Sequence, residues 1–349
     1  MKSTEAINLA LHEHMQSNEQ SVAMGLGIND PKRIFGTTSD LLESFGPSRI
    51  IEPPTSENAL TGICLGLAEN GFSVCLTHQR FDFALLSLDQ IINSIAKWKF
   101  MFSKDDQNIS LLIRLIVGRG WGQGPTHSQS YHSFLASIPG LNVIYPYNPE
   151  SFYSAILSGM SAADPTVVIE HRWLHNVQSD KDITQFDPSY SFSSKPKLLS
   201  KGENLTIFTY GYVVPDLLQI VSYLAKYNVT FDLLVITNLS KISLTELTES
   251  INKTKNLIMI EPFHLESSII STTVSKLLKH RAIRQNLSNF EIHSLPFEHE
   301  STSYFQTSDR YFTCSKLISL INDLLDTSIP LLPQQGTHDV PGDWFKGPF

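Results

Sequence analysis

A histidine at the end of a glycine-rich stretch has the type and spacing of residues that do chemistry. Residues 118–130 read GRGWGQGPTHSQS, with four glycines at alternate positions before His127. A histidine titrates near neutral pH, so it could hold a carboxylate or transfer a proton. The glycines would let the backbone approach a ligand closely, often a phosphate.

The same stretch matches neither of the common phosphate-binding patterns. A P-loop needs a lysine directly after its last glycine, and a dinucleotide-binding loop needs GxGxxG at the start of a helix. Neither occurs in residues 118–130. The stretch is therefore either a plain turn after a strand or a frame that presents His127, with Trp121 and Gln123 shaping the pocket or a subunit contact.

Glu57 is the second candidate for chemistry. It precedes small and apolar residues in the segment ENALTGICLG, residues 57–66. A carboxylate at the start of a helix stabilises the helix dipole, which is the simplest interpretation. A glutamate that apolar neighbours remove from water also has a raised pKa, and it can then exchange a proton near neutral pH. The residues alone leave both interpretations open.

Apolar runs that alternate with helical patterns must position these residues, and they predict an α/β protein with parallel sheets. The strand ending at residue 118 leads directly into the glycine-rich stretch, and ligand sites in parallel sheets form at the carboxyl ends of strands. The expected strands are 73–77, 110–118, 142–146, 166–171, 205–211, 230–236 and 256–261, and the expected helices are 85–102, 150–162, 214–227, 243–253 and 315–325.

A polar segment divides this pattern into two domains. Residues 176–200 are rich in Ser, Asp, Lys and Pro and show no regular period, so they are predicted to be a linker. The predicted domains are residues 1–175 and 201–326, and residues 327–349 form a C-terminal extension with many Pro and Gly residues. The length of 349 residues fits two domains.

Composition and charge argue against several classes of protein. Acidic residues outnumber basic ones by 34 to 26, for a net charge of −8, which disfavours nucleic acid or an anionic membrane surface as the main partner. No apolar run reaches the roughly 18 residues that span a bilayer. The three cysteines form no CxxC pair, so neither a disulfide framework nor a zinc site is indicated. We expect a reducing, cytoplasmic setting.

Five stretches carry a resemblance to a known family. They are RIIEPPTSENALTGICLGLAENG (49–71), RFDFALLSLDQIINSIAKW (80–98), PTHSQS (125–130), IPGLNVIYPYNPESFYSAI (138–156) and DPTVVIEHRWLH (164–175). In this order they resemble the β subunit of the thiamine-diphosphate-dependent E1 component of 2-oxo acid dehydrogenases. The resemblance implies two doubly wound α/β domains, a pyrimidine-binding domain followed by a transketolase C-terminal-like domain.

The resemblance also implies catalytic roles for Glu57 and His127. Glu57 falls on the family's catalytic glutamate, which shares a proton with a ring nitrogen of the coenzyme and so helps the thiazolium C2 to lose its proton. His127 matches the family's active-site histidine, which holds the substrate carboxylate or moves a proton. Phe83 falls where the family stacks an aromatic ring on the pyrimidine, and Phe81 is the other candidate for that wall.

Three consecutive polar residues depart from the family pattern. His78, Gln79 and Arg80 stand where dehydrogenase β subunits typically have more apolar residues. Gln79 is predicted to bind the cofactor, and His78 and Arg80 to bind the substrate. Arg80 could pair with a carboxylate or a phosphate, or it could form a structural ion pair.

The family's metal-binding motif is missing from this chain. The family holds the diphosphate through Mg²⁺ bound by a GDG motif and a later Asn, and no GDG occurs here. The resemblance therefore implies an α-like E1 subunit that carries the motif and the Mg²⁺, in an α₂β₂ heterotetramer with the thiamine diphosphate between the subunits. No metal ligand is predicted in this chain, and Asp164 is offset by two positions from the acid that helps bind a structural potassium in some relatives.

Several functions stay open at the level of sequence. The leading hypothesis is decarboxylation of a 2-oxo acid, with transfer of the product to a lipoyl group on an E2 core. A thiamine-diphosphate-dependent carboligase with an aldehyde acceptor, or half of a split transketolase, are the enzymatic alternatives. A non-catalytic β-like scaffold is the remaining one, although it would have no need for Glu57. The C-terminal domain departs from the family at its expected E2-docking surface, which puts that docking in doubt.

Overall fold

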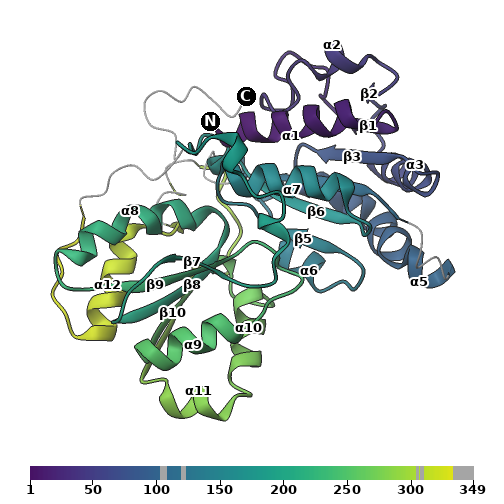
Figure 1. The fold of residues 1–349 in the computed structure, drawn as a ribbon. Coiled ribbons are helices and arrows are strands. Elements are labelled where there is room, and N and C mark those ends of the chain that lie inside the picture. The colour runs from purple at the N-terminus through teal and green to yellow at the C-terminus, as the bar shows by residue number, and fades with distance from the viewer. Residues whose placement is uncertain (103–107, 119–122, 304–305, 307–309, 333–349) are drawn as a thin grey trace. The chain divides into compact units, whose positions relative to one another are not determined.

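The computed structural model describes residues 1–102, 108–118, 123–303, 306 and 310–332. Within these residues the chain divides into two compact units, each built around its own sheet (Figure 1). The N-terminal unit contains Met1–Gly118, Thr126–Phe192 and Asn238–Ser240. The C-terminal unit contains residues 123–125, Ser193–Thr237 and the described residues from Lys241 on.

The sheet of the N-terminal unit is parallel throughout, with the strand order β2-β1-β3-β4-β6-β5. Its central strands are apolar runs that are buried along their whole length, as expected when helices cover both faces of a parallel sheet. The strands are β1 (Ser21–Gly25), β2 (Ile50–Ile51), β3 (Ser73–His78), β4 (Leu111–Val117), β5 (Asn142–Ile144) and β6 (Thr166–His171).

Helices cover this sheet, and α1 packs along α7. Helix α7 begins where the sequence favours a start, because the Asn148 side chain accepts a hydrogen bond from the Ser151 amide at 2.9 Å and Pro149 occupies the first turn. The α-helices are α1 (Ser3–Ser17), α2 (Leu41–Phe45), α3 (Glu57–Glu69), α4 (Phe81–Ala84), α5 (Trp98–Phe102), α6 (His132–Ala136) and α7 (Pro149–Ser161).

The helix predicted at 85–102 is longer and less regular than the sequence indicates. It starts at Phe81 with α4, because Arg80 is still extended, with a φ of −141°. Between α4 and α5 the chain forms two 3₁₀ turns, Leu85–Ser87 and Ile95–Lys97, on either side of a π-helical turn at Gln90–Ser94. The apolar period shows that the segment is helical but carries no information on which hydrogen-bond pattern each turn adopts.

The C-terminal unit has a five-stranded sheet with the order β11-β10-β8-β9-β7. Strands β8 (Leu205–Tyr210), β9 (Phe231–Ile236), β10 (Asn256–His264) and β11 (Asn289–Leu295) are parallel. The helices are α8 (Val214–Ala225), α9 (Thr245–Thr254), α10 (Ile269–Leu277), α11 (Arg281–Asn286) and α12 (Cys314–Leu325). The doubly wound α/β fold predicted from the sequence is thus confirmed.

The segment predicted to be a linker is more ordered than its composition suggests. Its last residues form β7 (Lys197–Ser200), an edge strand antiparallel to β9. Two 3₁₀ turns precede it, Ile183–Gln185 and Tyr190–Phe192. An edge strand is half exposed, so its polar residues hide the period by which strands are recognised. Of the predicted C-terminal extension, residues 333–349 lie outside the described residues.

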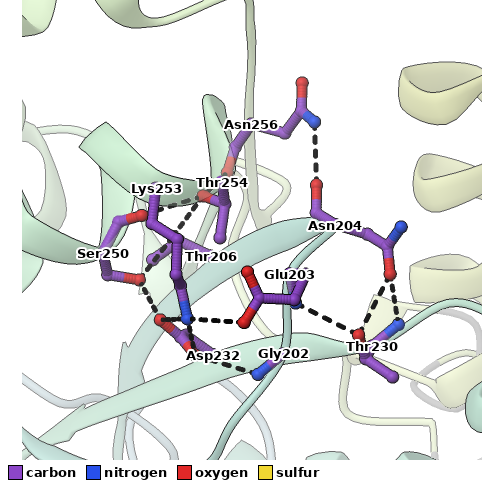
Figure 2. A network of polar contacts seen from close by, with 10 residues as sticks. All are labelled: Gly202, Glu203, Asn204, Thr206, Thr230, Asp232, Ser250, Lys253, Thr254 and Asn256. Atoms are coloured by element: carbon purple, nitrogen blue, oxygen red, sulfur yellow. Dashed lines mark hydrogen bonds and ion pairs between the residues drawn. The ribbon is translucent and has the colours of Figure 1, made fainter.

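A polar network ties α9 to the amino ends of β8 and β9 (Figure 2). The Asp232 carboxylate accepts hydrogen bonds from the Gly202 amide at 2.9 Å, from Ser250 Oγ at 2.7 Å and from Lys253 Nζ at 2.9 Å. Burial raises the pKa of Asp232, but these donors outweigh burial and hold it below its usual value. Because this network lies at the amino ends of the strands, opposite the edge where ligands bind in such sheets, we interpret it as structural.

Candidate active site

A pocket of about 80 Å³ opens at the carboxyl ends of β1 and β3 in the N-terminal unit. These strands are parallel neighbours, so the residues that end them meet at one edge of the sheet. The start of α3 and the helix α4 complete the wall. The pocket is lined by Leu26, Ser56, Glu57, Leu60, Thr77, His78, Gln79 and Phe83.

Glu57 is the first residue of α3, and its side chain is half-buried at the pocket wall. The helix begins here because small and apolar residues follow, and the Glu57 carbonyl accepts a hydrogen bond from Thr61 Oγ1 at 2.8 Å. Among the described residues, the Glu57 carboxylate has no hydrogen-bond or ion-pair partner. The carboxylate is therefore available to a ligand in the pocket.

Phe83 provides the aromatic wall of the pocket, and Phe81 does not. Phe83 is 38% exposed and lines the cavity. Phe81 is completely buried, with its ring against Tyr131 at a centroid distance of 6.0 Å. Phe81 thus faces the core and Phe83 faces the cavity, a difference that the sequence alone did not show.

His127 lies beside this aromatic wall. Its ring meets the Phe83 ring edge-on, with centroids 5.7 Å apart and planes at 88°. Its Nδ1 atom is 3.0 Å from Thr126 Oγ1. His127 therefore lies at the same edge of the sheet as Glu57. Trp121 lies outside the described residues, and the role of Gln123 stays a prediction.

A hydrogen bond that the sequence did not predict joins the His127 loop to α4. Gln129 Nε2 donates to Asp82 Oδ1 at 2.8 Å, and Tyr131 donates its hydroxyl proton to Gln129. Burial raises the pKa of the Asp82 carboxyl. Gln129 belongs to the HSQ motif, so the motif itself was the available signal that this residue has a role. The contact fixes the loop relative to the phenylalanine wall.

Gln79 lines the pocket while its amide holds the backbone of a neighbouring loop. Its Nε2 atom donates to the Leu26 carbonyl at 2.7 Å. A Cβ atom at Gly27, which has a φ of +74°, would approach Gln79 Nε2 to 1.9 Å. Gly27 therefore permits both the left-handed turn and the close approach of Gln79.

Arg80 lies behind the pocket rather than in its lining. It is 7% exposed, its NH1 group donates to the Gln79 carbonyl at 3.0 Å, and its guanidinium lies 5.5 Å from the centre of the Phe35 ring. Burial lowers the pKa of Arg80, while nearby Asp82 favours its charged form. Its assignment to the substrate stays a prediction.

His78 is a deeply buried polar side chain of the pocket. It ends β3, is 4% exposed and borders the cavity with Glu57. Burial lowers the pKa of its imidazole to about 4, so the ring is neutral near pH 7. Among the described residues, no side chain or backbone group bonds its Nε2 atom.

A buried ion pair, also missed by the sequence analysis, supports the floor of the site. Arg114 in β4 and Glu170 in β6 are both 0% exposed, with Nε and Oε1 2.5 Å apart. The arginine also donates to Thr37 Oγ1 at 2.8 Å and contacts Thr77 of the pocket lining at 3.4 Å. Burial opposes the charge of Glu170, but Arg114 overrides it and lowers the pKa of Glu170 to about 2. The sequence did contain a signal for this pair, because the apolar runs LLIRLIV and TVVIEH each include one charged residue, Arg114 and Glu170.

Neither a metal site nor a membrane span is found in the part of the chain that the structure describes. There, three or more His, Cys, Asp or Glu side chains nowhere gather as a metal would require, and no helix is long and apolar enough to cross a bilayer. Asp164, the residue near the potassium position of some relatives, instead pairs with Lys99 at 2.8 Å.

Comparisons with known proteins identify the relatives of this chain. A family model described as "Transketolase, pyrimidine binding domain" matches residues 1–177. The pyruvate dehydrogenase E1 component subunit beta-2 of Oryza sativa is 28% identical over 74% of this chain and 68% of its own length. The 2-oxoisovalerate dehydrogenase subunit beta of Bacillus subtilis is 25% identical over 88% of this chain and 95% of its own.

A solved structure shares the fold over most of the length. It is described as "Split gene transketolase, inactive beta4 tetramer", with a TM-score of 0.73 and 16% identity. The match covers 93% of this chain and 98% of the other. The resemblance inferred from the sequence motifs is therefore confirmed.

Proposed function

Because the chain belongs to the family of transketolase pyrimidine-binding domains, we propose that it is the β-like subunit of a thiamine-diphosphate-dependent 2-oxo acid dehydrogenase of the E1 type. The observation that carries the proposal is the gathering of Glu57, Phe83 and His127 at one edge of the N-terminal sheet. Each comes from a different part of the sequence, and each falls on a functional position of the family.

The pocket fits the aminopyrimidine ring of the cofactor. Leu26, Leu60 and the Phe83 ring offer apolar surface to a flat heterocycle, and Glu57 offers an unpartnered carboxylate to its edge. When bound, thiamine diphosphate supplies a carbon nucleophile that attacks the 2-oxo acid and accepts electrons on decarboxylation.

Glu57 would hold and return a proton at a ring nitrogen of the pyrimidine. Its position at the start of α3 places the carboxylate where the helix dipole favours negative charge, which keeps it a competent acceptor. A ligand ring that closes the pocket would also exclude water from the carboxylate and the ring nitrogen that it meets.

His127 would act on the substrate side of the same edge. Its ring is half-buried, so it can reach a substrate while Phe83 limits its rotation. A histidine in this position can donate a hydrogen bond to the 2-oxo acid carboxylate or pass a proton during turnover. Its placement supports the predicted role.

We further propose that a second chain completes the site. The sequence contains no GDG motif to hold Mg²⁺ and the diphosphate. An α-like subunit with that motif would supply both, in an α₂β₂ heterotetramer. Transfer of the product to a lipoyl-bearing E2 core belongs to the same proposal.

The test is reconstitution with an α-like chain that carries the GDG motif. We expect calorimetric titration to detect thiamine diphosphate binding in the mixture and not in this chain alone. Glu57→Gln, which keeps the size of the side chain, should lower turnover of a 2-oxo acid by at least about 100-fold. Turnover at the wild-type rate in that variant would contradict the role of Glu57, and tight binding by this chain alone would contradict the shared site.

A carboligase or transketolase-like half-enzyme is the second candidate. It is favoured by the polar residues His78 and Gln79 in the pocket lining, which suit a hydroxylated substrate. The two candidates differ in the acceptor. Product found on a lipoyl domain supports the dehydrogenase, whereas product found only with an added aldehyde supports the carboligase.

A further inference from the structure

Besides Glu57, the pocket is lined by His78, which has a ring nitrogen without a partner among the described residues. His78 is 4% exposed, and among the described residues its Nε2 atom makes no hydrogen bond. His78 is nevertheless one of the residues that line the cavity, together with Glu57 and Phe83. Buried polar atoms in folded proteins are nearly always hydrogen-bonded. An unpartnered imidazole at a cavity wall therefore indicates a hydrogen bond to the group that fills the cavity.

Two other buried histidines of the same unit, His14 and His132, have hydroxyl partners, whereas His175 Nδ1 has no hydrogen bond among the described residues but does not line the pocket. His14 places its Nε2 atom 2.9 Å from Ser73 Oγ and its Nδ1 atom 3.3 Å from Ser161 Oγ. His132 places its Nδ1 atom 2.8 Å from Ser130 Oγ. These rings have hydroxyl partners within the protein, and neither lines the pocket. His78 differs from both, because its Nε2 atom has no hydrogen bond among the described residues and because it lines the pocket.

We propose that His78 hydrogen-bonds the heteroaromatic ring that binds against Glu57, on an edge that the carboxylate does not reach. The inference rests on the proposed function and adds a ligand-binding residue to it. An aminopyrimidine carries two ring nitrogens and an exocyclic amino group, and one carboxylate can engage only part of that polar edge. Glu57 and His78 line the same pocket, whose volume is only about 80 Å³.

The state of the imidazole suits this contact. Burial keeps the ring neutral near pH 7, with one nitrogen that donates and one that accepts. A neutral ring can meet either a ring nitrogen or an amino group without bringing a second charge beside Glu57. The position at the end of β3, inside the sheet, holds the ring in place before a ligand arrives.

Three variants of the full chain, assembled with its α-like partner, test the inference. His78→Phe fills the same space without a hydrogen bond, and His78→Gln keeps a polar atom close to the Nε2 position. His14→Phe is the matched control, because it removes a buried histidine that has partners. The measurements are calorimetric titration with thiamine diphosphate and thermal unfolding of the ligand-free chain.

We expect His78→Phe to weaken thiamine diphosphate binding by roughly tenfold, and His78→Gln to restore it to within about threefold of wild type. The melting temperature of ligand-free His78→Phe should equal or exceed that of wild type, since no internal hydrogen bond is lost. His14→Phe should show the reverse, a lower melting temperature with unchanged affinity.

Other results would overturn the inference. Equal affinity in wild type and His78→Phe would remove the proposed contact, and a raised KM for the 2-oxo acid with unchanged cofactor affinity would assign His78 to the substrate. A melting temperature that falls as much as in His14→Phe would make the role structural. If the wild-type complex itself binds no thiamine diphosphate, the proposed function fails, and that outcome is distinct from the others.

Discussion

At the scale of single residues, the two phenylalanines of the segment RFDF lie in different surroundings although only one residue separates them. Phe81 is completely buried and Phe83 is 38% exposed at the pocket. The chain turns into α4 at this point, so neighbouring side chains face the core and the cavity in turn. An aromatic residue in a motif can therefore serve stability or binding, and only its position in the fold decides which.

Substitution of each phenylalanine should separate these tasks. Phe81→Ala should lower the free energy of unfolding by about 3–5 kcal/mol, because it leaves a cavity in the core. Phe83→Ala should cost about 1 kcal/mol or less, since much of its ring already contacts water, while thiamine diphosphate affinity of the assembled complex falls roughly tenfold. Urea unfolding and calorimetric titration check both values. A larger stability loss in Phe83→Ala than in Phe81→Ala would contradict the assignment.

At the scale of elements, the pocket depends on the turn that follows β1. Gly27 has a φ of +74°, and Gln79 Nε2 occupies the space that a side chain at Gly27 would need. The Gln79 amide in turn holds the Leu26 carbonyl. The geometry of one pocket wall is thus set by a glycine that contributes no side chain.

Gly27→Ala should lower the free energy of unfolding by about 1–2 kcal/mol, because alanine disfavours the left-handed conformation. Its methyl group should also displace the Gln79 amide and weaken ligand binding. Gly66→Ala is the control: Gly66 lies inside α3, where nothing meets an added Cβ, and alanine should raise stability by up to about 1 kcal/mol. Urea unfolding measures both. Equal stability of the two variants would show that the turn after β1 tolerates a side chain.

The elements that could be predicted from sequence are those with continuous apolar runs. Strands β3, β4 and β6 lie within one residue of their predicted bounds, because burial on both faces leaves no polar residue to blur them. Strand β7 was not predicted, because an exposed edge strand lacks a continuous apolar run. The π-helical turn was not predicted either, because the apolar pattern of a helix does not show which hydrogen bonds each turn makes.

The candidate site was predictable to a similar degree. Glu57, His78, Gln79 and Phe83 line one pocket, as expected from motifs placed at strand ends. The Arg114–Glu170 pair was not predicted, because its partners are 56 residues apart and each looks like an isolated charge in an apolar strand. Long-range pairing of this kind requires the strand order, which the sequence does not provide. The catalytic and binding roles themselves stay predictions.

At the scale of the whole molecule, the N-terminal unit depends on that ion pair for its behaviour in acid. The folded-state pKa of Glu170 is about 2, below its ordinary value of 4.5. The pair therefore contributes its full stability above about pH 4.5 and loses it as the pH falls toward 2. The sheet that carries the site should weaken over this range even when no ligand is present.

Glu170→Gln should lower the free energy of unfolding by about 3–5 kcal/mol at pH 7, because it leaves the buried Arg114 without a counter-charge. The difference from wild type should shrink as the pH approaches 2. Glu43→Gln removes an exposed partner of Arg33 and should cost less than about 1 kcal/mol at any pH. Chemical unfolding at a series of pH values tests this. A Glu170→Gln effect that is independent of pH would contradict the cited pKa.

The π-helical turn at Gln90–Ser94 has a consequence for the history of the chain. Such a turn accommodates one residue more than an α-helix does in the same span, so it is what an insertion leaves when the helix around it is kept. Deleting one residue there should therefore restore α-helical geometry while α4 and α5 keep the faces that they present now. The same deletion from a regular α-helix would rotate everything beyond it by about 100°, so the π-helical turn is what lets this segment differ by one residue in length without turning α5.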